Sequence, residues 1–336
     1  MMLRRHHLRW LAAVASSALF VYVVARVKPE VILDKVRLLG WGFAALILLS
    51  GIRSVLRAVA WSYCVQTDGR HPATIDLFVP RLVSEALNDS LPLGPVLGET
   101  AKVVGISRFI PAQAGATSVV IEDLIYALAA LTFMLGGVAL ALFSLTTSRA
   151  FQWTATSLLI GLLAAVLAAH WMARRHISVL GGTLDFLKRA GLRWAFLERH
   201  QSQLRAMERD IYDFFVAHKR LFSFVFAIEF ATNFTGIAEA YLILQVTAAH
   251  ASLHAAYLVE TANRAVQLVF SFVPFQLGIQ EGVAAATLET LGYAASEGVS
   301  LAIVRKIRTV FWTALGLLLA AKYAAPQSTT RESSAS

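Results

Sequence analysis

Six long apolar segments, spread from one end of this chain to the other, constrain its fold more than any other feature. They comprise residues 8–26, 43–65, 117–145, 153–173, 221–248 and 296–322. Each reaches or approaches the roughly 20 residues that a helix needs to cross the hydrocarbon core of a bilayer. Of the 336 residues, 57% are hydrophobic and 15% charged, whereas soluble domains carry about 25% charged residues. We therefore predict an all-α polytopic membrane protein, and the composition excludes intrinsic disorder, collagen and an ordinary soluble enzyme domain.

Two further apolar stretches, 75–109 and 253–291, contain proline, glycine and acidic residues near their middles. Broken hydrophobic segments are tolerated at membrane depth only where protein or a water-filled cavity covers the freed backbone groups. We interpret these stretches as two re-entrant broken-helix hairpins, which gives about six to eight transmembrane helices in all. Residues 1–325 are expected to form a single transmembrane domain, and the Ser/Thr-rich tail at 326–336 is expected to be disordered.

The basic residues indicate how the chain is oriented. The formal net charge is +9, and many lysines and arginines gather at the ends of apolar runs. This is the topology signal of membrane proteins, not the clustered basic patch that binds nucleic acid. The connection 174–220 holds ten basic and five acidic residues, so we place it in the cytoplasm with the N-terminus. Its apolar residues recur at helical spacing and predict an amphipathic helix, lying either on the cytoplasmic leaflet or against the ends of the spans.

The two broken stretches resemble one another and predict an internal repeat. Each contains a Glu-x-x-Asn sequence, a Pro/Gly break and a second glutamate. The matched residues are Glu85, Asn88 and Glu99 in the first and Glu260, Asn263 and Glu281 in the second. Downstream, Glu122 lies 23 residues after Glu99, and Arg305 lies 24 residues after Glu281. Since an odd number of crossings separates the two units, the repeat would be inverted, as in many secondary transporters; chance similarity is the alternative.

Charged side chains inside apolar spans are costly, so each is a functional hypothesis that needs a partner. Acids and bases together predict a hydrophilic interior that holds a zwitterionic or anionic group, because guanidinium groups suit phosphate. The candidate substrate-binding residues are Glu85, Asn88, Gly98, Glu99, Lys102, Glu122, Glu229, Asn233, Glu260, Asn263, Arg264, Gly278, Gln280, Glu281, Arg305 and Arg308.

A structural role is the alternative for these residues. Buried charges can pair with one another and only fix the helix register. We assign Arg57 and Asp123 to that class, Arg57 because its long side chain can reach the cytoplasmic interface. Asn88 and Asn263 could likewise cap helices at the breaks.

Enzyme signatures are absent from the sequence. It contains no Gly-x-Ser-x-Gly, Walker-type or His-Glu-x-x-His motif, and Cys64 is its single cysteine. These motifs carry nucleophilic, nucleotide and zinc chemistry. We therefore expect no catalytic residue, no metal site, no cofactor and no enzymatic activity.

Two motifs at the breaks resemble the signatures of a known family. Asn88 with Pro92, followed by Gly98-Glu99 and Lys102, resembles the first signature of the lysylphosphatidylglycerol synthase transmembrane (flippase-like) family. The run 274–282, Pro-Phe-Gln-Leu-Gly-Ile-Gln-Glu-Gly, is similar to its second signature. The resemblance covers residues 51–319, and residues 81–88 are also similar to the branch associated with hopanoid synthesis.

The resemblance implies a multi-span inner-membrane protein that moves or handles lipids. The matching motif positions are Asn88, Gly98, Glu99, Glu122, Gly278, Glu281 and Arg305. The chain departs from the family where Phe275-Gln276 stand in place of a glycine pair and Lys102 stands in place of an arginine, so the resemblance implies no particular lipid headgroup. Since no aminoacyl-transferase domain is recognised, synthesis of lysylphosphatidylglycerol is not expected.

Three functions of different classes remain. We favour a lipid transporter or flippase for an anionic, zwitterionic or isoprenoid-type lipid, whose partners are the lipid and the bilayer. The second is a non-catalytic membrane partner that recruits a lipid or hopanoid biosynthetic enzyme through 174–220. The third, ranked lowest, is a membrane enzyme acting on a lipid phosphate, because no nucleophile is recognisable.

Overall fold

The structure, a computed structural model, describes residues 37–66, 71–91, 93–144, parts of 153–171, 201–248, 250–271, 273–276 and 278–324. Within these ranges the chain is helical and contains no strand, which confirms the predicted all-α membrane fold. The elements are α3 (Trp41–Cys64), α4 (Thr74–Ser90), α5 (Gly94–Ile106), α6 (Ala112–Ser144), α10 (Gln201–Ala217), α11 (Lys219–Thr247), α12 (Leu253–Val269), the 3-10 helix η1 (Pro274–Gln276), α13 (Ile279–Thr290) and α14 (Ala295–Ala324).

Three of these helices, α3, α6 and α11, are long and apolar enough to cross a membrane. They correspond to the predicted spans 43–65, 117–145 and 221–248. The predicted span 296–322 is a continuous 30-residue helix, α14. Its apolar sequence is interrupted by the basic residues Arg305, Lys306 and Arg308. The predicted span 8–26 and the tail 326–336 lie outside the described residues, as does most of 153–173.

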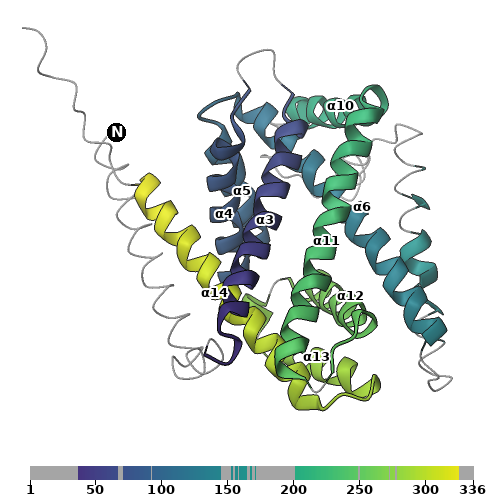
Figure 1. Ribbon diagram of the computed structural model, residues 1–336. Coiled ribbons are helices and arrows are strands. Elements are labelled where there is room, and N and C mark those ends of the chain that lie inside the picture. Colours follow the sequence, from purple (N-terminus) through teal and green to yellow (C-terminus); the bar gives the residue numbers. More distant parts are fainter. Residues whose placement is uncertain are drawn as a thin grey trace, which may run out of the picture.

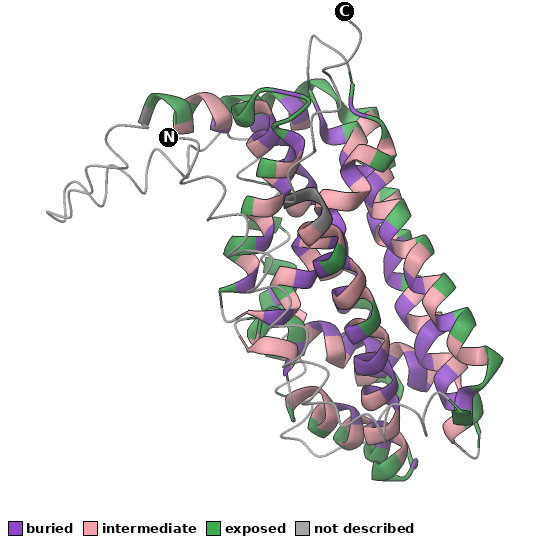
Figure 2. Ribbon diagram, turned by 90° about the vertical axis from the view of Figure 1, so that its left-hand side faces the viewer, coloured by how far each residue is buried: buried purple, intermediate pink, exposed green. Residues whose placement is uncertain are grey.

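The surface of the long helices is apolar and their interior is charged. Leu48 and Ile52 on α3 and Phe234 on α11 are exposed, whereas Glu122 and Glu229 are 0% exposed. Figure 2 shows buried and exposed residues alternating along each long helix. Soluble proteins have the opposite distribution, with ionic residues almost always outside. The exposed apolar faces therefore suit contact with lipid.

Both broken stretches form helical hairpins. The first consists of α4 and α5, and Pro95 stands in the first turn of α5, where a missing N–H costs nothing. The second consists of α12 and α13, with η1 between them. Gly278 precedes α13 with φ of +83°, a conformation that glycine adopts without strain, and its N–H donates to Glu281 Oε2 at 2.9 Å. Pro92 lies outside the described residues.

The order of elements repeats. A long helix, a hairpin and a second long helix occur as α3, α4–α5, α6 and again as α11, α12–α13, α14. Figure 1 shows α3 and α11 side by side and running in opposite directions, with the first hairpin in the upper half and the second in the lower half. The two units are thus arranged as the inverted repeat that the sequence predicts.

The connection between the halves contains α10, which packs against α6 and α11. Its residues Ile211 and Phe214 are buried in an apolar cluster with Trp61, Ile121 and Val225. The apolar face of α10 is therefore covered by protein, which favours packing against the span ends over insertion into the leaflet. Residues 174–200 of the predicted amphipathic connection lie outside the described residues.

Candidate functional site

Buried charges gather in two groups, which are centred on Glu122 in the first half of the chain and on Arg305 in the second half. We call the first the Glu122 cluster, which consists of Glu122 with Arg57, Arg81, Lys102, Glu99, Asp123 and Glu229. We call the second the Arg305 cluster, which consists of Arg305 with Glu239, Glu260, Arg264 and Arg308. Glu122 and Arg305 each stand ten residues after the first residue of their helix, α6 and α14 respectively.

In the Glu122 cluster, one carboxylate accepts hydrogen bonds from three cations. Oε1 of Glu122 accepts from Arg57 Nη2 and from Arg81 Nη1, both at 3.0 Å. Oε2 accepts from Lys102 Nζ at 3.1 Å. These cations come from α3, α4 and α5, so one buried acid on α6 joins all four elements of the first half. A buried charge is tolerated only when it is paired in this way.

Further acids compensate the excess positive charge of the Glu122 cluster. Lys102 Nζ lies 2.8 Å from Glu99 Oε2 and 2.9 Å from Asp123 Oδ1. Arg57 Nε lies 3.2 Å from Glu229 Oε2 on α11. Arg57 is thus held between two buried acids, and the prediction that it reaches the cytoplasmic interface is wrong, because ion pairing inside the bundle replaces solvation by water.

In the Arg305 cluster, the central residue is a base and its partners are acids. Arg305 Nη2 lies 2.7 Å from Glu260 Oε2, and Arg264 Nε lies 2.9 Å from Glu260 Oε1. Arg308 Nη1 lies 2.6 Å from Glu239 Oε2, and Arg305 Nε lies 3.9 Å from Glu239 Oε1. Acids and bases of α11, α12 and α14 therefore alternate in one network.

Tyr126 connects the two clusters. Its hydroxyl accepts a hydrogen bond from Arg264 Nη1 at 2.6 Å, and the Arg57 guanidinium lies 3.7 Å from the centre of its ring. A cation over an aromatic face is attracted by the ring electrons. One side chain on α6 thus contacts a base of each cluster.

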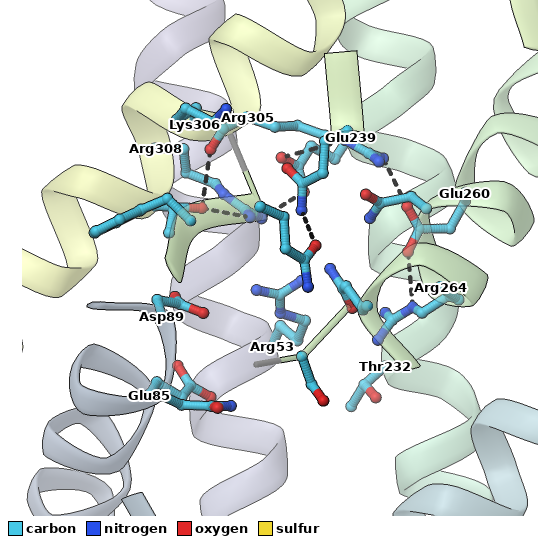
Figure 3. Close-up of a pocket in the computed structure, with 18 of the residues that line it drawn as sticks. Arg53, Glu85, Asp89, Thr232, Glu239, Glu260, Arg264, Arg305, Lys306 and Arg308 are labelled. Atoms are coloured by element: carbon cyan, nitrogen blue, oxygen red, sulfur yellow. Dashed lines mark hydrogen bonds and ion pairs between the residues drawn. The ribbon is translucent and has the colours of Figure 1, made fainter. Parts of the chain in front are cut away.

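A polar cavity of about 210 Å³ lies where the two hairpin breaks meet (Figure 3). Six basic and four acidic residues line it, together with the amides Asn88, Asn263, Gln267, Gln276 and Gln280. Typical small-molecule pockets measure about 300–1,000 Å³. This cavity is therefore large enough for a small polar group but not for a whole lipid.

The backbone at the edge of the cavity is strained. Phe275 and Gln276 have φ values of 51° and 45°, and they are the only non-glycine residues with positive φ in the described part of the chain. Each such residue costs about 1–3 kcal/mol, and such strain clusters at ligand-binding sites. Both side chains line the cavity, so the strained turn holds part of its wall.

The sequence matches the family described as the lysylphosphatidylglycerol synthase TM region over residues 9–316. The chain belongs to this family. No curated protein and no solved structure shows significant similarity to it.

In this member of the lysylphosphatidylglycerol synthase TM family, half of the predicted site residues line the cavity. They are Glu85, Asn88, Glu260, Asn263, Arg264, Gln280, Arg305 and Arg308. The side chains of Asn88 and Asn263 make no hydrogen bond to the part of the chain that the structure describes, so neither caps a helix.

The other predicted residues lie outside the cavity. Glu99, Lys102, Glu122 and Glu229 belong to the Glu122 cluster. Asn233 donates to the backbone of α11 at Glu229 O, 2.9 Å away, and Glu281 pairs with Lys306. Gly98 packs against Ser84 inside the first hairpin, and Gly278 begins α13.

Five charged residues of the cavity are missing from the predicted set: Arg53, Arg57, Asp89, Glu239 and Lys306. Signals for two of them are present in the sequence. Asp89 directly follows Asn88, and Lys306 directly follows Arg305. Arg53 stands one helical turn before Arg57, and Glu239 stands in an apolar run. For both residues, the sequence does not show which neighbouring helix the charge faces.

Proposed function

We propose that this protein is a lipid transporter of a bacterial inner membrane, with its N-terminus in the cytoplasm. The polar headgroup of the lipid would occupy the cavity while the acyl chains stay in the bilayer. The observation that carries the proposal is a cavity lined by ten charged residues at the centre of helices whose outer faces are apolar. Intramembrane charges facing a cavity typically mark substrate pathways.

The dimensions of the cavity support a headgroup rather than a whole lipid. A volume of about 210 Å³ fits a phosphate with a short substituent, and guanidinium groups match phosphate through parallel hydrogen bonds. The inverted order of the two hairpins supports transport, since such repeats let one half move against the other around a central site. The lipid that we propose is of the anionic, zwitterionic or isoprenoid type.

We propose no catalytic role and no cofactor for these residues. The cavity bases are engaged mainly by carboxylates of the same network, an arrangement that suits binding. A membrane partner that recruits a biosynthetic enzyme through 174–220 remains the alternative, and transport by the pure protein separates the two.

The test uses the two cavity asparagines, because they have no partner in the described structure and their loss should leave the fold intact. We expect Asn88→Leu and Asn263→Leu to reduce lipid translocation in vesicles containing the full-length protein by about tenfold, since each removes a hydrogen bond to a charged group. Gln203→Leu, which changes an exposed amide of α10, is the matched control.

Wild-type protein that moves no lipid faster than protein-free vesicles would contradict the proposed function. Equal translocation by wild type and both asparagine variants would contradict the proposal that the cavity binds the lipid headgroup. A stable fold of each variant is checked by its elution as a single species in detergent.

A further inference from the structure

The cavity contains two charged residues that make no close ion pair, although opposite charges lie within longer electrostatic range of both. Of the ten charged residues that line it, eight make at least one ion pair. Arg53 on α3 and Asp89 on α4 make none: within the residues that the structure describes, no opposite charge lies within 4.0 Å of either. Neither side chain makes a hydrogen bond to any residue that the structure describes.

Arg53 and Asp89 face the same space. Figure 3 shows both side chains beside the cavity, below the dense network of Arg305 and Arg308, and no dashed line reaches either of them. Both are half-buried. They come from adjacent elements of the first half, since α3 packs directly on α4.

An unpaired charge inside a membrane protein is costly. The neighbouring residues show that pairing is available in this cavity, because Arg264, Arg305 and Arg308 all reach carboxylates at 2.6–2.9 Å. One cation and one carboxylate that stay apart are therefore complementary to a ligand that brings one negative and one positive group.

We infer that the cavity selects a zwitterionic phospholipid headgroup, with its phosphate on Arg53 and its ammonium group on Asp89. This inference rests on the proposed function, and it narrows the substrate class of the same site. The planar guanidinium of Arg53 matches phosphate oxygens through parallel N–H donors. The amide of Asn88, one residue before Asp89, supplies a further uncommitted donor or acceptor.

A purely anionic headgroup satisfies only half of this arrangement. A phosphoglycerol headgroup would pair with Arg53 and leave Asp89 without a counter-charge. It would also bring a negative group close to Glu85, which lies one helical turn before Asp89 and also lines the cavity. The acids on α4 thus discriminate against anionic lipids by repulsion, and favour an amine.

The test measures binding separately from transport. Full-length protein in detergent is equilibrated with phosphatidylethanolamine and phosphatidylglycerol of identical acyl chains, and bound lipids are quantified by native mass spectrometry. We expect wild type to prefer phosphatidylethanolamine by about tenfold, the value of one charge-assisted hydrogen bond. Asp89→Asn should abolish the preference by weakening phosphatidylethanolamine alone, whereas Arg53→Gln should weaken both lipids.

Matched controls are Glu289→Gln on α13 and Arg209→Gln on α10, which remove exposed charges outside the cavity. Wild type with no preference, or with a preference for phosphatidylglycerol, overturns the inference without affecting the proposed function. Equal weakening of both lipids by Asp89→Asn also overturns it, because Asp89 would then act only as a structural counter-charge for Arg53. Selective binding without translocation supports the headgroup assignment and contradicts the proposed function.

Discussion

The Glu122 and Arg305 clusters occupy matching positions in the two halves but carry opposite central charges. In the first half an acid on α6 is surrounded by bases from α3, α4 and α5. In the second half a base on α14 is surrounded by acids from α11 and α12. The same order of helices thus surrounds a central acid in one half and a central base in the other.

The two clusters also differ in what they face. Glu122 is completely buried and does not line the cavity. All five residues of the Arg305 cluster line it: Arg305, Glu239, Glu260, Arg264 and Arg308. Apart from Arg57, which also lines the cavity, the Glu122 cluster holds helices together, whereas the Arg305 cluster forms part of the candidate site. Three variants test this difference.

The largest effect is expected for Glu122→Gln. The change removes the carboxylate that Arg57, Arg81 and Lys102 share, and these cations keep their other acids, Glu229, Glu85 and Asp123 respectively. Loss of one partner from a buried ion network costs about 3–5 kcal/mol. We expect a strongly lowered unfolding temperature or no folded protein, measured by thermal unfolding in detergent. Arg305→Gln is the paired comparison. It should destabilise less, because Glu239 and Glu260 line the polar cavity, unlike Glu122, and keep Arg308 and Arg264 as partners. Equal destabilisation by both changes would show that the clusters do not differ in role.

An intermediate effect is expected for Tyr126→Phe. The variant removes the acceptor of the Arg264 hydrogen bond but keeps the ring that faces Arg57. A hydrogen bond to a charged group contributes about 1.5–3 kcal/mol. We expect a stability loss within that range, together with slower lipid translocation, because the connection between the two clusters is weakened. Unchanged stability and unchanged transport would show that Tyr126 does not couple the two clusters. Tyr63→Phe, on the exposed side of α3, is the control.

The smallest effect on stability is expected for Gln276→Gly. Relief of the positive φ stabilises the fold by about 1 kcal/mol. This offsets the loss of two hydrogen bonds, one from Gln280 Nε2 at 2.7 Å and one to the Phe270 carbonyl oxygen at 3.4 Å. The cavity becomes wider, because the Gln276 side chain lines it. We therefore expect near-constant thermal stability but faster translocation of a phospholipid whose headgroup carries an added sugar, relative to its unmodified parent. A large loss of stability would show that the hydrogen bonds of the Gln276 side chain stabilise this part of the cavity more than the strained backbone destabilises it.

Much of the fold follows from apolar segment length. The spans at α3, α6 and α11 and both hairpins could be predicted, because about 20 apolar residues and a Pro/Gly break have few alternative structures in a bilayer. The repeat can be recognised in the sequence from Glu85-x-x-Asn88 and its counterpart, Glu260-x-x-Asn263. These are the residues that the structure brings to one cavity.

The division between structural and cavity charges could not be predicted. Glu122 and Arg305 stand at matching positions of the repeat, but Glu122 contacts Lys102 outside the cavity, whereas Arg305 lines the cavity. Which charges stay unpaired depends on contacts between helices that are far apart in sequence, such as Arg57 with Glu229. Arg53 was indistinguishable from any arginine in an apolar run until its surroundings were known.

The location of the counter-charges has a consequence for how the protein is made. Arg57, Arg81 and Lys102 all meet Glu122 within the first half, and Arg305 meets Glu239 and Glu260 within the second. Each half can therefore neutralise its central charge while it is inserted, before the other half is complete. The ion pair of Arg57 with Glu229 and the hydrogen bond of Arg264 to Tyr126 form when the halves associate. A gene duplication could thus have produced this architecture from a unit that was already electrically balanced when it stood alone.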